Sequence, residues 1–163
     1  MKPEQTTNNA LFLANAEATD NLGQRLASLL RAGDTVFLIG DLGAGKTALA
    51  RAVISAKLDA VGLAEDIPSP TFTLVQTYEA DLPIWHADLY RLTGPEEAEE
   101  LGLADAMEDS IVLIEWPDRL ADLTPERRLE VSLDFSADGE GRIASLTPFG
   151  DGWAGRIEAL TND

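Results

Sequence analysis

A glycine-rich segment carries the clearest chemistry in this sequence of 163 residues. Residues 40–47 read GDLGAGKT, which fits the pattern G-x-x-x-x-G-K-[ST], and an apolar run, TVFLI, lies directly before it. Glycines let successive backbone N–H groups turn inward toward phosphate oxygens, and a helix that begins near the lysine adds the positive end of its dipole. The segment therefore predicts a phosphate-binding P-loop between a strand and a helix.

Individual loop residues have distinct expected roles. Lys46 is expected to be an exposed loop lysine that reaches the β- and γ-phosphates and so takes part in catalysis, while the Thr47 hydroxyl is expected to bind Mg²⁺. The remaining residues expected to line the nucleotide are Asp41, Leu42, Gly43, Ala44, Gly45 and Ala48.

A second candidate lies at the end of the apolar run IVLIE. P-loop enzymes use a carboxylate to hold or orient the metal, and Glu115 stands where such an acid is expected, at the end of a strand beside the P-loop strand. Glu115 is therefore predicted as a catalytic residue and a metal ligand. Trp116 follows it and is either a core aromatic residue or a stacking partner close to the nucleotide.

The only histidine of the chain belongs to a third motif, HADLYR. Strand alternation would place His86, Asp88 and Tyr90 on one face. Beside a P-loop, this face predicts a catalytic role in which His86 or Asp88 orients the attacking water, although a lone histidine is more often structural. In the segment SPTFT (69–73), Thr71 or Thr73 could sense the γ-phosphate, or the segment could simply lead into a strand.

Hydrophobic periodicity supplies the elements that must position these groups. A helix with Thr19 as its N-cap is expected before the P-loop strand, and a second helix is expected to run from the P-loop to about Ala60. An acidic helical stretch is expected over 95–109, and further strands over 10–15, 74–80, 82–90 and 110–116, a hairpin over 128–135 and 142–148, and a short helix over 152–160. The fold class predicted for residues 1–163 is one α/β P-loop NTPase domain, with a mainly parallel central sheet, added antiparallel strands and flanking helices.

Composition limits the possible settings. The chain has no cysteine and no apolar run long enough to span a bilayer, so a reduced, cytoplasmic location away from membranes is expected. With 29 acidic and 12 basic residues the formal charge is −17. Such a chain would repel a polyanion, so any nucleic acid it serves should be held by another protein. The acidic stretch from Glu96 to Asp109 is either a contact for that protein or a solvated helix.

Missing motifs narrow the nucleotide and the reaction. A guanine-specific N-K-x-D motif does not occur, which favours ATP over GTP. Kinases of small molecules usually bring several arginines over the transferred phosphate, whereas Arg91 is the only arginine between Leu58 and Glu115. This argues against a kinase without excluding one.

Taken together, GDLGAGKT, SPTFTL, HADLYRL and LIEWP resemble the bacterial TsaE (YjeE) family, ATPases of tRNA threonylcarbamoyladenosine (t6A) biosynthesis. The resemblance implies ATP and Mg²⁺ as ligands, a place near the nucleotide base for the region of Thr19, and hydrolysis that supports the partner proteins TsaD and TsaB. It implies contact with tRNA only through that partner complex. The alternatives are a small-molecule kinase and a regulatory module that binds ATP without hydrolysing it.

Overall fold

The computed structural model describes residues 9–63, 65–70 and 73–161. These form seven strands, five α-helices and one 3₁₀ segment, η1. In chain order they are β1 (Ala10–Leu13), α1 (Ala16–Leu29), β2 (Thr35–Ile39), α2 (Lys46–Ala60), β3 (Val75–Glu79), β4 (Pro83–Asp88), α3 (Pro95–Glu100), α4 (Leu103–Asp109), β5 (Ile111–Glu115), η1 (Pro117–Leu123), β6 (Arg128–Phe135), β7 (Arg142–Phe149) and α5 (Ala154–Thr161).

All seven strands belong to one sheet with the order β1-β7-β6-β2-β5-β4-β3. Strand β2 pairs in parallel with both β5 and β6, and β5 pairs in parallel with β4. The pairs β1–β7, β6–β7 and β3–β4 are antiparallel and lie toward the two edges. The predicted fold class, a mainly parallel centre with added antiparallel strands, is therefore confirmed.

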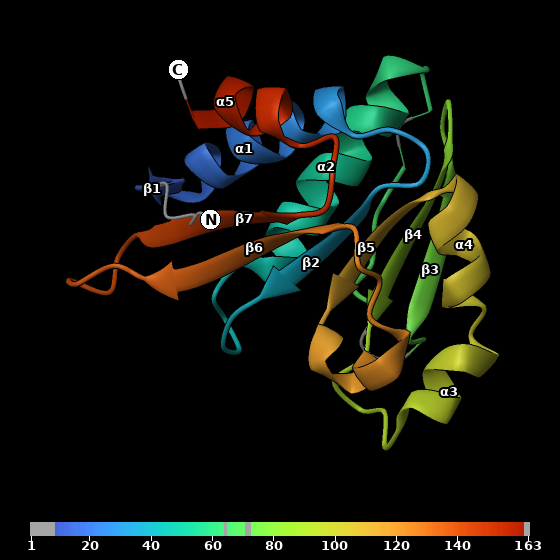
Figure 1. The fold of residues 1–163 in the computed structure, drawn as a ribbon. Helices are drawn as coiled ribbons and strands as arrows, with labels where there is room; N and C mark the ends of the chain where they lie inside the picture. Colours follow the sequence, from blue (N-terminus) through green and yellow to red (C-terminus); the bar gives the residue numbers. More distant parts are fainter. Residues whose placement is uncertain (1–8, 64, 71–72, 162–163) are drawn as a thin grey trace.

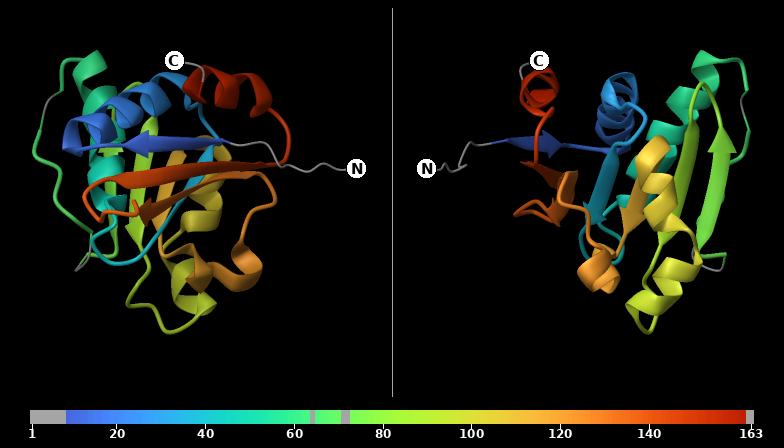
Figure 2. Two further views of the ribbon diagram at one scale, coloured as in Figure 1. Left: turned by 90° about the vertical axis from the view of Figure 1, so that its left-hand side faces the viewer. Right: turned by 45° about the vertical axis from the view of Figure 1, so that its right-hand side comes forward.

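Alternating side chains divide the apolar residues between two layers. On β2, Val36 and Leu38 belong to the core beneath α1 and α2, whereas Phe37 belongs to a second core on the opposite face. Figures 1 and 2 show α1, α2 and α5 on one side of the sheet, with η1, α3 and α4 on the other. Burial on both faces explains why β2 and β5 read as continuous apolar runs.

Helices α1 and α2 pack closely because glycine occupies their contact. A Cβ added at Gly23 would lie 2.3 Å from the Cβ of Ala52, closer than two carbon atoms can approach. The missing side chain lets α1 lie against α2 over its middle turns. Its first turn then lies near the start of α2, next to the P-loop.

Two sequence predictions about helices are wrong in detail. Helix α1 begins at Ala16, and Asn15 is the N-cap, because its side chain accepts a hydrogen bond from the Ala18 N–H at 3.0 Å. Thr19 is therefore not the cap but a buried residue of the first turn. The stretch 95–109 is not one solvated helix: Gly102, at φ 83°, separates α3 from α4, and both helices bury apolar side chains.

The C-terminal hairpin and helix confirm their predicted positions, and a buried ion-pair cluster holds α5 in place. Asp34, just before β2, accepts a hydrogen bond from the Arg156 guanidinium and lies 3.0 Å from that of Arg127. Both guanidiniums stack on the Trp153 ring. Segment η1, which the sequence analysis did not predict, turns the chain back after β5.

None of the helices in the described residues is both long and apolar enough to cross a membrane.

Replacing Gly23 by alanine tests the close contact of α1 with α2. The new methyl group must push the helices apart, so we expect Gly23→Ala to lower the free energy of unfolding by about 1–3 kcal/mol, as overpacked cores do. Chemical denaturation measures this loss. The matched control is Gly155→Ala in α5, where an added Cβ meets no atom within 4 Å. A Gly23→Ala protein as stable as the control would contradict the packing argument.

Candidate active site

The P-loop takes its shape from backbone conformations between β2 and α2. Gly45 is the N-cap of α2 with φ 106° and ψ 13°, a left-handed conformation that side-chain-bearing residues rarely adopt. Just before it, the Ala44 N–H donates to the Asp41 carbonyl at 3.0 Å and closes a turn. The first turn of α2 therefore presents its free N–H groups at the carboxyl end of the parallel strands, where anions bind.

Lys46 is the first residue of α2, and it is not exposed as the sequence analysis expected. Its exposed fraction is 5%. The ammonium group donates to the carbonyls of Gly40 at 2.6 Å and Asp41 at 2.9 Å. It also lies 4.4 Å from the centre of the Trp116 ring. The lysine is thus held inside the loop by three contacts.

The electrostatic setting of Lys46 combines burial with nearby carboxylates. Burial is the largest effect and lowers the pKa of its amine below the ordinary value, whereas Glu115, Asp88 and Asp41 each act to raise it. Since a buried ammonium benefits from any anion that replaces lost hydration, this position suits a group that meets phosphate.

Trp116 reaches the site through an unusual backbone turn. Its φ of 58° and ψ of 54° lie in the left-handed region, which is uncommon for a bulky residue. The turn redirects the chain from β5 into η1. The indole ring then lies against both the Lys46 ammonium and the Tyr90 ring, 4.8 Å away between centres. Trp116 is thus a half-buried residue of the site.

A short hydrogen-bonded chain joins α2, β5 and β4. The Thr47 hydroxyl donates to the Glu115 carboxylate, at 2.8 Å from Oε1 and 3.0 Å from Oε2. On the far side, His86 Nε2 lies 2.7 Å from Oε2 of Glu115. His86 is fully buried, and its Nδ1 has no hydrogen-bond partner among the described residues. The ring therefore supports the carboxylate from behind.

Strand register explains why these residues meet. Glu115, the last residue of β5, lies beside Leu38 of β2 and beside Asp88 of β4. Parallel neighbours end at the same edge of a sheet, so the P-loop that follows β2 and the acids that end β4 and β5 converge there. The spacing of the sequence motifs predicted this convergence.

Only two of the three residues predicted to share a strand face in the motif HADLYR lie on a strand. His86 and Asp88 lie within β4, and Asp88 is buried at 6% exposure. The strand ends at Asp88, so alternation does not extend to Tyr90. Its N–H instead donates to Asp88 Oδ1 at 3.0 Å, and its ring is 44% exposed beside Trp116. Asp88 is therefore fixed at the strand end, whereas Tyr90 is at the rim.

Arg142 contacts the P-loop although no sequence motif predicted it. This residue starts β7 and donates from Nε to the Ala44 carbonyl and from Nη2 to the Gly43 carbonyl, both at 3.2 Å. Its guanidinium also stacks on the Phe135 ring at 4.3 Å. The arginine is 95 positions from the nearest P-loop residue in the chain, and no local motif marked it. Only the hairpin topology brings it there.

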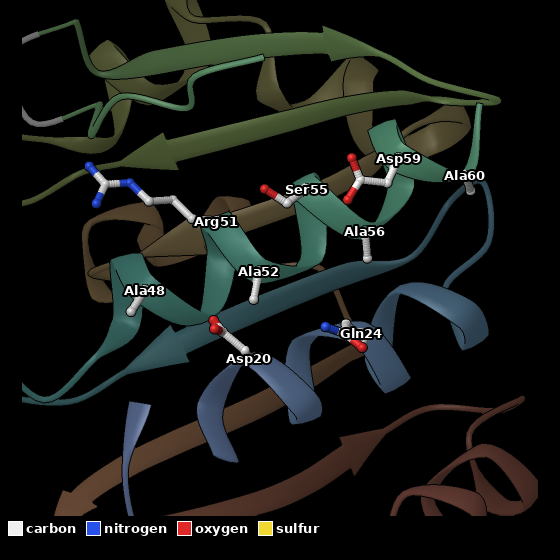
Figure 3. Close-up of a pocket in the computed structure, with 9 residues that line it drawn as sticks. All are labelled: Asp20, Gln24, Ala48, Arg51, Ala52, Ser55, Ala56, Asp59 and Ala60. Carbon is white, nitrogen blue, oxygen red and sulfur yellow. The ribbon is translucent and has the colours of Figure 1, made fainter. Parts of the chain in front are cut away.

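Two hollows adjoin the first turn of α2. One, of about 230 Å³, lies between α1 and the hairpin and is lined by Thr19, Ala48 and Arg142 among others. The other, of about 760 Å³, is a groove between α1 and α2. Figure 3 shows Asp20 of α1 directed toward Ala48 and Ala52 of α2, and both Asp20 and Ala48 line the two hollows. The two hollows are therefore neighbours on either side of Asp20 and Ala48.

The loop before β3 is described only in part. Thr71 lies outside the described residues. Thr73 is exposed, and its hydroxyl accepts a hydrogen bond from the Gln76 side chain at 2.7 Å. The possible role of this loop in sensing phosphate stays a prediction.

The two side chains predicted to bind Mg²⁺, those of Thr47 and Glu115, lie together at the start of α2. The described residues contain no group of three or more histidine, cysteine, aspartate or glutamate side chains that could hold a metal ion. Mg²⁺ in nucleotide sites is typically held by one or two protein oxygens, several waters and the phosphates. The binding of Mg²⁺ by Thr47 and Glu115 stays a prediction.

Comparison with known proteins identifies the family of this chain. Residues 13–143 match the model of the family described as "Threonylcarbamoyl adenosine biosynthesis protein TsaE". A Rickettsia felis protein named as tRNA threonylcarbamoyladenosine biosynthesis protein TsaE is 42% identical over 83% of this chain and 78% of its own. A protein of the same name from a Nostoc species is 41% identical over 85% of each chain. Another, from Streptomyces coelicolor, is 38% identical over 82% of this chain and 92% of its own.

The fold likeness extends to a solved structure. The crystal structure of Bacillus subtilis YdiB superposes with a TM-score of 0.77 over 98% of each chain, at 24% identity. That likeness concerns the fold alone. The family model and the relatives at about 40% identity decide the family, and they confirm the resemblance found in the sequence motifs. The chain belongs to the family of threonylcarbamoyl adenosine biosynthesis proteins TsaE.

Proposed function

We propose that this protein binds ATP with Mg²⁺ at the P-loop and hydrolyses it as a component of the t6A modification machinery, acting with TsaD and TsaB. The observation that carries the proposal is the hydrogen bond from Thr47 to Glu115, directly after a loop of P-loop conformation. In P-loop NTPases a hydroxyl and a strand-end carboxylate in this relation hold and orient the metal. The relatives named for t6A biosynthesis supply the biological setting.

Phosphate binding would draw Lys46 away from the loop. Its ammonium now donates to the Gly40 and Asp41 carbonyls, two neutral acceptors. Phosphate oxygens would be stronger acceptors for a buried cation because they carry charge. The amide groups of residues 43–47 and the dipole of α2 would bind the same anion.

The metal and the attacking water need separate groups. Thr47 and Glu115 would hold Mg²⁺, which when bound offsets negative charge on the phosphates. Asp88, fixed at the neighbouring strand end, is the better candidate to orient water. His86 is fully buried with its Nε2 on Glu115, so its expected role changes from orienting water to positioning the metal ligand.

The nucleoside would lie beside the P-loop in the hollow lined by Thr19, Ala48 and Arg142. The small side chain of Ala48 leaves room there, and Thr19 comes from the first turn of α1. Arg142 already bridges two carbonyls of the loop and lies where it could contact a phosphate or the sugar.

Partners would bring the tRNA. With a formal charge of −17, the protein repels polyanions, and affinity for nucleic acid depends largely on neutralising phosphates. An ATPase of this charge can serve tRNA modification only if the partner complex supplies the basic surface. ATP hydrolysis would then act on that complex rather than on tRNA directly.

The positioning role of His86 can be separated from a direct catalytic role. Because removing a side chain that hydrogen-bonds to a metal ligand typically changes metal affinity 10- to 100-fold, we expect His86→Leu to raise the Mg²⁺ concentration for half-maximal turnover about tenfold. ATP affinity without Mg²⁺, measured by calorimetry, should stay within about twofold of wild type. His86→Gln, which keeps a donor, should restore most of the loss. An unchanged Mg²⁺ requirement with reduced turnover would instead assign His86 to the water.

Phosphate release tests the proposed function as a whole. We expect slow release from the protein with ATP and Mg²⁺, and an increase on the order of tenfold or more when TsaD, TsaB and tRNA are present together. Lys46→Met keeps the apolar stem beneath Trp116 but removes the charge, so it should fold and release no phosphate.

Two results would contradict the proposal. Release that rises with a small hydroxyl-bearing metabolite and needs no partner would identify a kinase. Tight ATP binding without release under any condition would identify a regulatory module.

A further inference from the structure

One half of the sheet has helices on only one face. Helices α1, α2 and α5 cover one side of β1, β7, β6 and β2, while η1, α3 and α4 cover the other side over β5 and β4 (Figures 1 and 2). Within the described part of the chain, no element covers the second face of β6, β7 and β1. Alternating residues of β6 turn polar side chains to that face, among them Arg128, Glu130 and Asp134.

A pocket of about 550 Å³ lies where this open face meets η1 and the start of the P-loop. Its apolar lining includes Ile39 at the end of β2, Trp116 and Pro117, and Phe37 lies at its base with 2% exposure. It is separate from the hollows beside Thr19, with which it shares no lining residue. The hollow proposed above for the nucleoside does not include it, although Asp41 and Trp116 both line the pocket and contact Lys46.

The pocket is strongly acidic. Four carboxylates line it, those of Asp41, Asp118, Glu130 and Asp134. Asp118 lies 3.2 Å from the guanidinium of the neighbouring Arg119, which is half-buried. Asp41 and Asp134 are exposed and make no salt bridge within the described residues.

The single basic side chain of the lining is already engaged. Arg128 Nε lies 2.9 Å from Glu130 Oε2, its Nη1 donates to the Pro125 carbonyl at 2.9 Å, and its guanidinium stacks on the Phe149 ring at 3.9 Å. Arg128 therefore neutralises Glu130, and Arg119 pairs with Asp118, which leaves Asp41 and Asp134 without a salt bridge among the described residues. A neutral or anionic occupant would leave them unbalanced.

We propose that this pocket is a docking site for an arginine-bearing segment of a protein partner, an inference that rests on the proposed function. An arginine has an apolar stem for the lining of Ile39 and Pro117. Its planar guanidinium matches carboxylates in a two-bonded geometry and stacks on aromatic rings such as Trp116, which a lysine ammonium does not match as well.

The pocket is connected directly to the P-loop lysine. Asp41 lines the pocket, and its carbonyl accepts a hydrogen bond from Lys46. Trp116 lines the pocket and contacts the Lys46 ammonium with its ring. A segment docked against Asp41 and Trp116 therefore touches two of the three residues that hold Lys46. If docking of the segment changes the affinity for nucleotide by some factor, linkage requires that nucleotide changes the affinity for the segment by the same factor.

Charge excludes the main rival occupants. A second copy of this chain carries the same formal charge of −17, and nucleic acid is a polyanion, so both are repelled by the acidic rim. The acidic helices α3 and α4 are a rival surface for a basic partner, and they provide a matched control.

Charge reversal at two rim positions tests the site. The pocket variant carries Asp118→Lys and Asp134→Lys. The helix variant, which is the control, carries Glu99→Lys on α3 and Glu108→Lys on α4. Both residues of the control are exposed, and the two variants change the net charge equally. Binding to the TsaD–TsaB complex with ATP is measured by biolayer interferometry. We expect the pocket variant to raise Kd at least about tenfold and the helix variant less than about threefold. The milder double variant, Asp118→Asn with Asp134→Asn, should have a Kd between that of the wild-type protein and that of the pocket variant.

A small probe separates this inference from the proposed function. The isolated protein is titrated with the peptide acetyl-Gly-Arg-Arg-Gly-amide, and a peptide with citrulline in place of arginine is the control. The docking site is supported if the pocket variant loses peptide binding and the helix variant keeps it. This holds even if the wild-type protein fails to bind TsaD–TsaB, because that failure would count against the proposed function instead.

Three results overturn the docking site. The first is an equal loss of affinity for the complex in both variants, because it would show that overall charge, and not the pocket, steers binding. The second is binding that the pocket variant leaves unchanged. The third is a dimer of the isolated protein that the pocket variant breaks, which would assign the face to a second copy.

Discussion

The hydrogen bond between Thr47 and Glu115 joins the start of α2 to the end of β5, and the site depends on the strand pairing that makes it possible. Because β2 and β5 are parallel neighbours, the loop after one and the acid at the end of the other meet at one edge. Buried, the Glu115 carboxylate needs partners on both sides. Thr47 supplies one and His86 the other, so the carboxylate is fixed before any ligand arrives.

A second constraint concerns Lys46. Its ammonium is buried among carbonyls and an aromatic ring, with carboxylates nearby that favour the charged form. The left-handed turn at Trp116 is a backbone cost that the surrounding structure must offset, and it places the ring against this lysine. The charge that we propose for phosphate binding is thus held inside the loop. Whatever contacts Asp41 or Trp116 acts on that charge.

Much of the site could be predicted from sequence because its parts lie in local motifs. The P-loop glycines, the strand-end acid Glu115 and the alternation of His86 with Asp88 each depend on a few neighbouring residues, and parallel pairing brings them together. Sheet class followed from the apolar runs in the same way. Burial of Lys46 was missed because it depends on Trp116, 70 positions away, and the partner of His86 could not be read from its own strand.

Features that depend on distant contacts or fine backbone geometry were not predictable. Arg142 reaches the P-loop only because the C-terminal hairpin pairs with β2 and β1. The N-cap is Asn15 and not Thr19 because both residues are suitable caps by type, and the backbone conformation, which the sequence does not give, decides between them. The acidic stretch read as one helix, but Gly102 adopts a left-handed turn that divides it.

A double-mutant cycle on Thr47 and Glu115 tests the central claim most directly, namely that the two side chains form one metal-binding unit. Thr47→Val and Glu115→Gln keep shape while removing the hydroxyl and the charge, and calorimetry gives the Mg²⁺-dependent part of the ATP binding free energy for each single variant and for the double. If they act together, the double variant should lose little more than the worse single variant, with a coupling energy of about 1 kcal/mol or more. Losses that add within about 0.3 kcal/mol would show that Thr47 and Glu115 act separately, and would contradict the account.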